Sequence, residues 1–374
     1  MSAVSYRRLL ALCRKETYQI VRDPTSVLIA FILPVTLLFI YGFALDLDLR
    51  NVRLGVARLD DGPAAVRFEQ ALADSGAFEV HASRDREALL REMARGDLRG
   101  VVTIPNDFSR RYLRGQEAPI QVAADGSEPN TSNFVASYVQ GTWETWKDAQ
   151  ALDAGATGPP RIDARVRSWY NPGEVSRYFI VPGSIAIVMT IIGALLTSLV
   201  VAREWERGTM EALLSTPVTR TELLLSKILP YYVLGMMAML LCLVVAIFAM
   251  GIPFRGSVPV LLAVTTLFLA CALGQGLFIS TVLRVQFVAA QAALTSAFLP
   301  ALMLSGFVFE INSMPWILRL LCRFLPARHF TSSLQTLFQA GNIASLLVPN
   351  CVFLALLGLF WLTLTARKTR RTLD

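Results

Sequence analysis

Six long apolar runs recur along the chain, and each is long enough to cross a lipid bilayer. A membrane-spanning helix needs about 20 consecutive apolar residues at ~1.5 Å rise per residue. The six runs contain no charged residue, and they occupy residues 26–45, 178–202, 228–254, 256–283, 285–309 and 346–366. The pattern predicts six transmembrane helices, and an even number of spans puts both termini on the same side.

Between the first and second runs, residues 46–175 change to alternating strand-like and helix-like patterns. Strands are predicted at 52–59, 78–82, 100–104, 119–124 and 161–169, and helices at 64–74, 85–95, just before 115 and 130–153. Strands that alternate with helices are typical of an α/β domain. We expect Trp143 and Trp146 to pack in its core or an interface rather than to hold a ligand. The Asp60-Asp61 pair is interpreted as a solvated turn.

Residues 1–25 differ from the spans because basic and apolar residues alternate at helical spacing over 4–22. This predicts an amphipathic interface helix on the cytoplasmic face of the membrane. The alternative for 26–45 is a cleaved signal peptide. We favour a retained anchor, since the apolar run is longer than a usual signal core and a polar leader precedes it. Residues 367–374 form a basic tail.

Composition and charge agree with a membrane protein. Hydrophobic residues make up 54% of the chain and charged residues 17%, with a mean hydropathy of +0.50, whereas soluble domains are about 25% charged. Residues 46–177 hold 17 Lys/Arg and 20 Asp/Glu, so the net charge of +7 belongs to the membrane-flanking parts. The short loops carry fourteen Lys/Arg on the side of the termini and four on the other side. This bias predicts cytoplasmic termini and an external 46–175 domain. Membrane lipid is an expected partner and nucleic acid is not, because no compact basic face with aromatic residues is present.

The chain lacks the motifs of the common enzymes. It has no GxxxxGK[ST], HExxH or GxSxG sequence, and its two His and five Cys show no zinc-ligand spacing. We predict no enzymatic activity, no metal and no cofactor in this chain. Polar residues inside the spans are few, and Gln275, Gln291 and Thr295 are the candidates for a substrate path. Hydrogen bonding between helices explains such residues equally well, so both interpretations stay open.

The loop between the second and third spans, residues 203–222, carries the most specific signal. Gly208 is expected to break the helix leaving the membrane, and Thr209 to cap a short new helix with Glu211 in its first turn. Pro217 is expected to stop that helix. The apolar face formed by Met210, Leu213 and Leu214 is predicted to be offered to a cytosolic partner. The alternative is an ordinary polar loop.

This loop resembles the ExGTxExLLxxP signature of type 2 ABC exporter permeases, which here runs from residue 206 to 217. Further matches lie at Trp169-Tyr170-Asn171-Pro172, Val181-Pro182, Leu304-Ser305-Gly306, Met314-Pro315 and from Pro326 to His329-Phe330. The layout of one span, a large external domain and five more spans is also similar. The resemblance covers essentially the whole chain and is strongest to bacterial multidrug-type permeases.

The resemblance implies an inner-membrane permease driven by a separate cytosolic ATPase, which would bind the ATP and Mg. The coupling residues implied by the signature are Glu204, Glu206, Gly208, Thr209, Glu211, Leu214 and Pro217. The N-terminal helix would be a second contact with the ATPase. Residues 310–328 would form external re-entrant helices, packed against protein because Pro315, Trp316 and Pro326 suit broken helices. A second permease copy or paralogue would complete the path, and the external domain is a plausible docking surface for a periplasmic adaptor.

The sequence therefore predicts an α-helical polytopic membrane protein with six transmembrane helices and an inserted α/β extracytoplasmic domain. Residues 176–366 would form the five-helix part of the membrane domain. The predicted function is the outward movement of an amphipathic drug-like or lipid-like molecule. One alternative is an ATP-driven mechanotransmitter or sensor that acts on a periplasmic partner without transport. Another is a membrane scaffold without an ATPase.

Overall fold

The computed structural model describes residues 5–44, 52–126, 129–153, 171, 175–309 and 311–369, except for the side chains of 44, 129–130, 151–153, 214 and 312. The chain divides into two compact units. Residues 1–46 and 167–374 form a helical unit, here called the membrane unit. Residues 47–166 form the second, called the α/β unit. The predicted strand at 161–169 lies outside the described residues.

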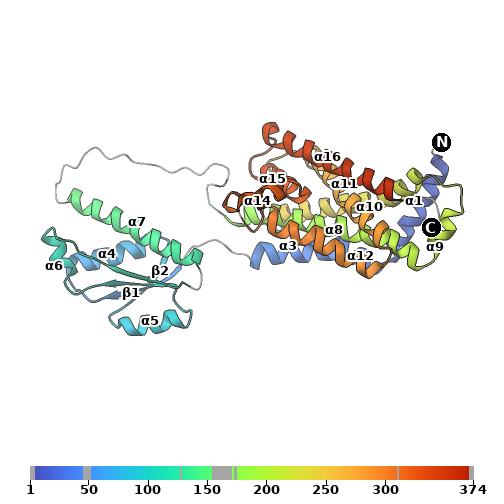
Figure 1. The fold of residues 1–374 in the computed structure, drawn as a ribbon. Coiled ribbons are helices and arrows are strands. Elements are labelled where there is room, and N and C mark those ends of the chain that lie inside the picture. The colour runs from blue at the N-terminus through green and yellow to red at the C-terminus, as the bar shows by residue number, and fades with distance from the viewer. Residues whose placement is uncertain are drawn as a thin grey trace. The chain divides into compact units, whose positions relative to one another are not determined.

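The membrane unit consists of helices alone (Figure 1). They are α1 (Tyr6–Arg22), α2 (Pro24–Val27), η1 (Leu28–Ile32), α3 (Leu33–Ala44), α8 (Arg177–Glu206), α9 (Thr209–Leu214), α10 (Arg220–Val244), η2 (Val245–Ala249), α11 (Val258–Leu283), α12 (Gln286–Ala293), η3 (Leu294–Phe298), α13 (Leu299–Leu304), η4 (Ile311–Ser313), α14 (Trp316–Arg323), α15 (Pro326–Gln339) and α16 (Ala344–Lys368). Within the described residues, six helical stretches are long and apolar enough to span a membrane, and they coincide with the six predicted runs: Pro24–Phe43, Arg177–Glu206, Arg220–Ala249, Val258–Leu283, Gln286–Leu304 and Ala344–Lys368.

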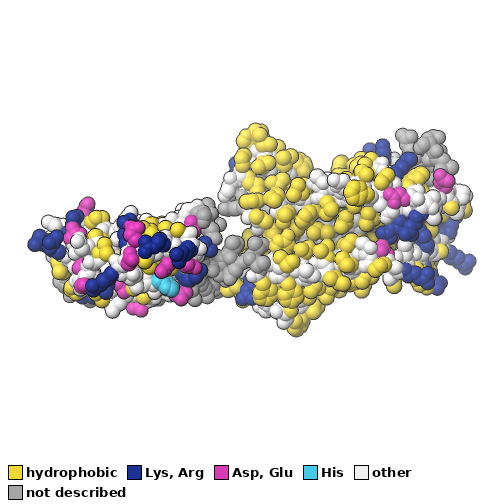
Figure 2. Space-filling model, turned by 90° about the horizontal axis from the view of Figure 1, so that it is seen from below, with side chains coloured by type: hydrophobic (Ala, Val, Ile, Leu, Met, Phe, Trp, Pro, Cys, Tyr) yellow, Lys and Arg dark blue, Asp and Glu magenta, His cyan; other side chains and the backbone are white. Residues whose placement is uncertain are grey.

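Helix α8 is the central element of this unit, and it is buried along most of its length. Helices α3, α10, α11, α12 and α15 pack around it. The closest approach is to α11, where Gly276 lies against Thr197 and Ala194 and Gly193 lies against Ala272. Small residues allow such backbone contact between helices in a membrane. The outer faces of the other helices form an apolar surface, and Lys and Arg gather at one end (Figure 2).

The α/β unit contains a four-stranded sheet in the order β2-β1-β3-β4. Its strands are β1 (Val52–Arg58), β2 (Phe78–Ser83), β3 (Gly100–Ile104) and β4 (Gln121–Ala124), and its helices are α4 (Pro63–Asp74), α5 (Arg86–Ala94), α6 (Phe108–Leu113) and α7 (Pro129–Asp153). Strands β2, β1 and β3 are parallel, and β4 is antiparallel to β3. In Figure 1, α5 covers one face and α4 and α7 the other. The predicted alternation of strands and helices is confirmed within the described residues.

The main core of the α/β unit lies under α4, α6 and α7 and is rich in aromatic rings. Trp146 is 5% exposed and lies beside Phe68, Phe108 and Trp143, with ring centroids 5.2–6.1 Å apart. Core packing of both tryptophans is therefore confirmed. Asp60 is more than a solvated turn residue, because its two carboxylate oxygens accept the backbone N–H groups of Gly62 and Ser109 at 2.8 and 2.6 Å.

The segment that follows α13 contains two short helices, α14 and α15, which are separated near Pro326. Of the α14 side chains only Cys322 is buried, and Trp316 is 68% exposed. The expectation that Trp316 packs against protein is wrong within this chain. The eight-residue α14 buries only the side that carries Cys322, whereas α15 buries eight of its fourteen residues.

Candidate functional site

The loop after α8 turns sharply at Gly208, whose φ of +67° lies in the left-handed region that favours glycine. Helix α9 then runs from Thr209 to Leu214 with Glu211 in its first turn, as predicted. Thr209 does not cap this helix. Gly208 occupies the cap position without a side chain, and the Thr209 hydroxyl turns back to donate to the carboxylate of Glu204. The short helix is confirmed, and the predicted cap is wrong.

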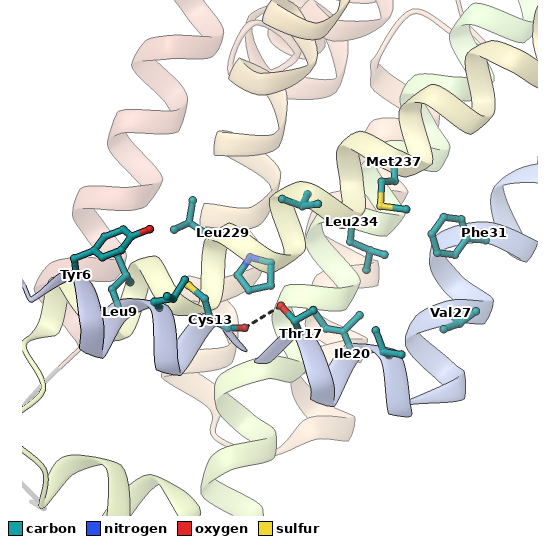
Figure 3. Close-up of a pocket in the computed structure, with 14 residues that line it drawn as sticks. Tyr6, Leu9, Cys13, Thr17, Ile20, Val27, Phe31, Leu229, Leu234 and Met237 are labelled. Atoms are coloured by element: carbon teal, nitrogen blue, oxygen red, sulfur yellow. Dashed lines mark hydrogen bonds between the residues drawn. The ribbon is translucent and has the colours of Figure 1, made fainter. Parts of the chain in front are cut away.

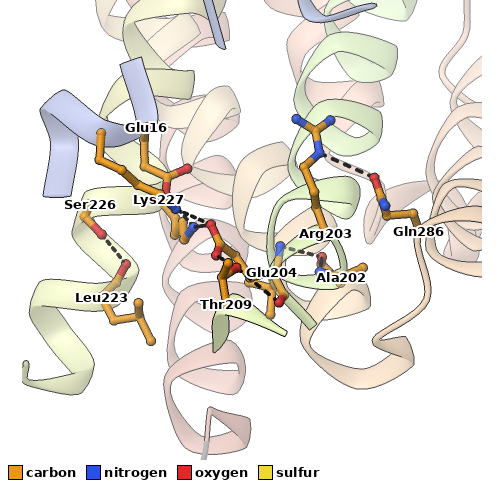
Figure 4. A network of polar contacts seen from close by, with 12 residues as sticks. Glu16, Ala202, Arg203, Glu204, Thr209, Leu223, Ser226, Lys227 and Gln286 are labelled. Carbon is orange, nitrogen blue, oxygen red and sulfur yellow. Dashed lines mark hydrogen bonds and ion pairs between the residues drawn. The ribbon is translucent and has the colours of Figure 1, made fainter. Parts of the chain in front are cut away.

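Beneath this loop, four charged side chains form a network, here called the ionic cluster: Lys15, Glu16, Glu204 and Lys227. Figure 4 shows three of them, Glu16, Glu204 and Lys227. The Lys227 Nζ atom lies 2.6 Å from Glu16 and 2.9 Å from Glu204. Lys15 contacts both carboxylates too, and its Nζ lies 3.0 Å from Glu16. Glu16, Glu204 and Lys227 are each 2% exposed. The two buried carboxylates are thus balanced by the buried ammonium group of Lys227 and by that of Lys15, whose side chain is 43% exposed.

The ionic cluster joins α1 to α8 and α10, and two further ion pairs extend that attachment along α1. Arg8 donates to Glu222 at 3.0 Å, and Arg203 lies 3.0 Å from Asp23. Burial acts to raise the pKa of Asp23. The hydrogen bond from Ser26 and the charge of Arg203 outweigh it and hold that pKa below its ordinary value. The interface helix is therefore docked by charge pairs onto two spans, which the amphipathic pattern alone did not reveal.

Two more contacts fix the end of α8. Glu206 accepts a hydrogen bond from the backbone N–H of Gln286 at 2.8 Å and another from the side-chain amide of that residue. It therefore provides an acceptor for a backbone N–H in the first turn of α12 that has no partner within the helix. The Arg284 guanidinium lies 4.4 Å from the centroid of the Trp205 ring. A small cavity of about 30 Å³ beside them is lined by residues of α8 to α11 and by Lys368 and Thr369. The start of α1 and the end of α16 thus meet the 203–222 loop at one end of the unit.

The signature residues fall into two groups. Glu204, Glu206 and Thr209 hold the loop to the helices, whereas Glu211 and Pro217 are exposed on its outer side. Met210 is 4% exposed and packs against α8, α10 and α11, so the prediction that it faces the cytosol is wrong. On a helix of only six residues, the apolar Met210 side chain more readily anchors the helix against the protein than projects away from it. The side chain of Leu214 lies outside the described residues.

The candidates for a substrate path lie on two helices. Gln275 is half-buried on α11, and Gln291 and Thr295 are exposed one turn apart on α12 and η3. The Thr295 hydroxyl donates to the carbonyl oxygen of Gln291 at 2.9 Å. Buried Thr190 and Thr197 likewise donate to their own helix, so their polar groups are satisfied locally. Among the described residues, no group of three or more His, Cys, Asp or Glu could hold a metal.

An apolar groove of about 530 Å³ lies where α1 crosses α10 (Figure 3). Its walls are formed by Leu9, Cys13 and Ile20 from one helix and by Leu229, Leu234 and others from the second. The Thr17 hydroxyl within it donates to the Cys13 carbonyl at 2.9 Å, so its proton is used within α1. The groove therefore offers an almost purely apolar surface beside the interface helix.

The six spans, the docked amphipathic helix and the 206–217 signature together define a polytopic permease. Residues 25–367 match the family described as ABC-2 family transporter protein, and the chain belongs to that family. It is 52% identical over 372 residues, 99% of each chain, to the probable multidrug ABC transporter permease YbhS of Escherichia coli (strain K12). It is 31% identical over 347 residues, 89% of this chain and 90% of the relative, to the probable multidrug ABC transporter permease YbhR of the same strain. The linearmycin resistance permease protein LnrN of Bacillus subtilis (strain 168) is 22% identical over 90% of this chain and 92% of its own. The predicted family is confirmed.

Proposed function

We propose that this chain is the permease subunit through which a cytosolic ATPase drives the outward movement of an amphipathic drug-like or lipid-like molecule. The names of the relatives support the transport of such cargo, since two of them are called probable multidrug permeases. The mild polarity of the spans supports an amphipathic cargo rather than an ion. The absence of a GxxxxGK[ST] sequence supports ATP and Mg binding on the partner.

The observation that carries the proposal is the attachment of α9 to the ionic cluster. A force applied to the exposed side of α9 reaches Glu204 through the Thr209 hydroxyl, and Glu204 is paired with Lys15 and Lys227. These three residues belong to α8, α1 and α10. Because buried ion pairs resist separation, the three helices should move together when a partner moves α9. Glu211 and Pro217 are then the residues in direct contact with the ATPase.

The same scheme assigns the remaining partners. The gathering of Lys and Arg at the α1 and α9 end supports a cytoplasmic location for both termini and an inner-membrane protein with an external α/β unit (Figure 2). Helices α3, α12 and α16 are mostly exposed, which supports contact with lipid and with a second permease, either a copy or a paralogue. The apolar groove beside α1 supports contact with an acyl chain. A periplasmic adaptor on the α/β unit remains a further proposal.

The mechanotransmitter alternative is not favoured, because the relatives are named as permeases. A scaffold without an ATPase would leave the exposed Glu211 without a purpose. The scaffold predicts that Glu211→Arg has no effect. The mechanotransmitter is discriminated by changes at Gln275 or Gln291, which should alter export in a transporter and leave signalling unchanged in a mechanotransmitter.

The test is Glu211→Arg in the full chain, with Glu117→Arg as the control. Both glutamates are exposed, both changes add the same charge, and Glu117 lies in the α/β unit. We expect Glu211→Arg to abolish co-purification of the ATPase or to lower ATP-driven export at least tenfold, and Glu117→Arg to leave both unchanged. Wild-type export in Glu211→Arg would refute the coupling assignment.

A further inference from the structure

Helix α15 lies at the opposite end of the membrane unit from α9 (Figure 1). A further pocket lies beside α15. It has a volume of about 470 Å³. One wall is α15, a second is the segment 305–311 after α13, and Phe179 at the start of α8 completes it. We call it the α15 pocket. It shares no residue with the 203–222 loop or with the apolar groove beside α1.

Polar atoms without partners gather in the α15 pocket. Arg328 and Gln335 line it from α15, and Ser305 lines it from the opposite segment. Their Nη1, Nε2 and Oγ atoms are buried, and none of the three atoms has a hydrogen-bond partner. Ser305 is only 2% exposed. A buried polar group without a partner is destabilising, and a charged one more so, so three at one place indicate a ligand rather than chance.

The helix geometry explains why these donors converge. Positions 328, 332 and 335 lie on one face of an α-helix, since neighbours on a face are three or four residues apart. The next residue on that face, Gln339, is paired: its side-chain amide donates to the Tyr178 carbonyl at 2.9 Å. That carbonyl is free of its own helix because Pro182, four residues later, has no N–H. Gln335, one turn earlier, has no such acceptor for its Nε2 atom.

The lining residues determine the chemistry that fits. Among the described residues they include no Asp or Glu, and Arg328 supplies a guanidinium. The rest of the wall is apolar, with Phe179, Phe307 and Phe309 among its members. A cation beside amide and hydroxyl donors selects a carboxylate or phosphate, and the aromatic wall selects an apolar body attached to it.

We propose that the α15 pocket binds the anionic head group of an amphiphile, with the Arg328 guanidinium on the charge and Ser305 and Gln335 on its oxygens. The apolar part of the amphiphile lies against the phenylalanines. Binding at this site does not depend on the coupling role of α9. The further statement that the bound amphiphile is cargo, rather than a resident membrane lipid, rests on the proposed transport function.

The first experiment measures binding of dodecyl phosphate to the purified full chain by native mass spectrometry, with dodecanol as the uncharged probe. We expect dodecyl phosphate to bind at least tenfold more tightly than dodecanol. Arg328→Met should remove that preference, and Gln335→Met should weaken dodecyl phosphate binding several-fold. Arg319→Met on the exposed face of α14 is the matched control, because it removes the same charge nearby, and it should bind as the wild type does.

Two results would overturn the proposal. Equal binding of the two probes would mean that the pocket holds only water and apolar chains. Unchanged binding in both Arg328→Met and Arg328→Lys would exclude the guanidinium, and Arg328→Lys keeps the charge in case the methionine variant does not fold.

The source of the amphiphile is decided by two further arms. A resident lipid would appear as an anionic lipid mass that co-purifies from cell membranes with the wild type and Arg319→Met but not with Arg328→Met. A cargo would stimulate ATP hydrolysis by the complex in vesicles made only of zwitterionic lipid, and Arg328→Met would lose the stimulation. Binding without either a resident lipid or stimulation would leave the pocket intact and count against the transport function alone.

Discussion

Asp60 shows how one carboxylate can organise a small domain. Each of its oxygens accepts one backbone N–H, from Gly62 and from Ser109. Partial burial acts to raise the pKa of Asp60, but these hydrogen bonds and the charge of Arg58 outweigh it and lower the pKa below its ordinary value. A group whose folded pKa is lowered stabilises the fold above its unfolded pKa and loses that effect as the pH falls.

We therefore predict that Asp60→Asn loosens the start of α6 at pH 7 and has little effect at low pH. The amide keeps one acceptor oxygen, so one of the two backbone hydrogen bonds is lost. Losing a bond worth about 1 kcal/mol should raise the hydrogen-exchange rate of the Ser109 backbone N–H roughly fivefold. The measurement is hydrogen–deuterium exchange of the full chain, comparing variant and wild type at the same pH. A difference that persists unchanged below about pH 4 would contradict the assignment to the ionised form.

Lys227 is the second residue with a sharp prediction. Replacing it with Met leaves Glu16 and Glu204 to share Lys15, whose side chain is 43% exposed. Breaking a buried ion pair from one side costs about 3–5 kcal/mol, so Lys227→Met should lower the thermal stability of the full chain strongly. Lys368→Met, which removes an exposed lysine at the same end, should not.

A second variant separates the charge from the packing. Glu16→Met together with Lys227→Met leaves Lys15 and Glu204 as a balanced pair, and it should recover at least half of the stability that Lys227→Met loses. If the double variant is as unstable as the sum of the single ones, the two residues do not act as a pair.

At the scale of elements, the turn at Gly208 sets the direction of α9. A Cβ at this position meets no atom within 4 Å, so any effect of substitution comes from the backbone. Gly208→Val should cost about 1–2 kcal/mol in the left-handed region and should reduce ATPase-coupled export. Gly208→Asn should retain most of the export, because asparagine tolerates the left-handed conformation. An equal loss of export in both variants, measured with equal amounts of folded protein, would mean that any side chain at position 208 interferes. The left-handed turn would then not be the cause.

Elements were predictable from the sequence wherever their signal is local. The apolar run 256–283 predicted α11, which spans Val258–Leu283, and the short apolar run 100–104 predicted β3. The ionic cluster was not predictable, because Lys15 and Glu204 are 189 residues apart and Glu16 and Lys227 are 211 apart. Nothing in the helical pattern of residues 4–22 says which acid is buried. Met210 was misplaced for a related reason, since a short amphipathic helix does not reveal which side of it the protein covers.

At the scale of the whole molecule, the membrane unit depends on the contact between α8 and α11. A Cβ on Gly276 would overlap the Thr197 hydroxyl and the Ala194 carbonyl oxygen. Because α8 is central and five other helices pack on it, separation of this pair would disturb all of them. Gly276→Ala should therefore lower the yield and the melting temperature of the full chain.

The control is Gly141→Ala on α7, where the added methyl meets no atom within 4 Å. That change should be neutral or should stabilise its helix by up to about 1 kcal/mol, since alanine is the better helix former. A similar loss of stability in both variants would show that the close approach of α8 and α11 is not the cause.

The ion pairs of α1 have a consequence for how the chain is made. Lys15 and Glu16 leave the ribosome long before Lys227, which follows Glu16 by 211 residues. At about 5–20 residues per second this delay is roughly 10–40 seconds. During that time the acidic and basic side chains of α1 face water or lipid head groups without their permanent partners. Helix α1 is thus synthesised well before it can reach its final position, and a half-made chain stopped before α10 would display it to the quality-control machinery of the cell.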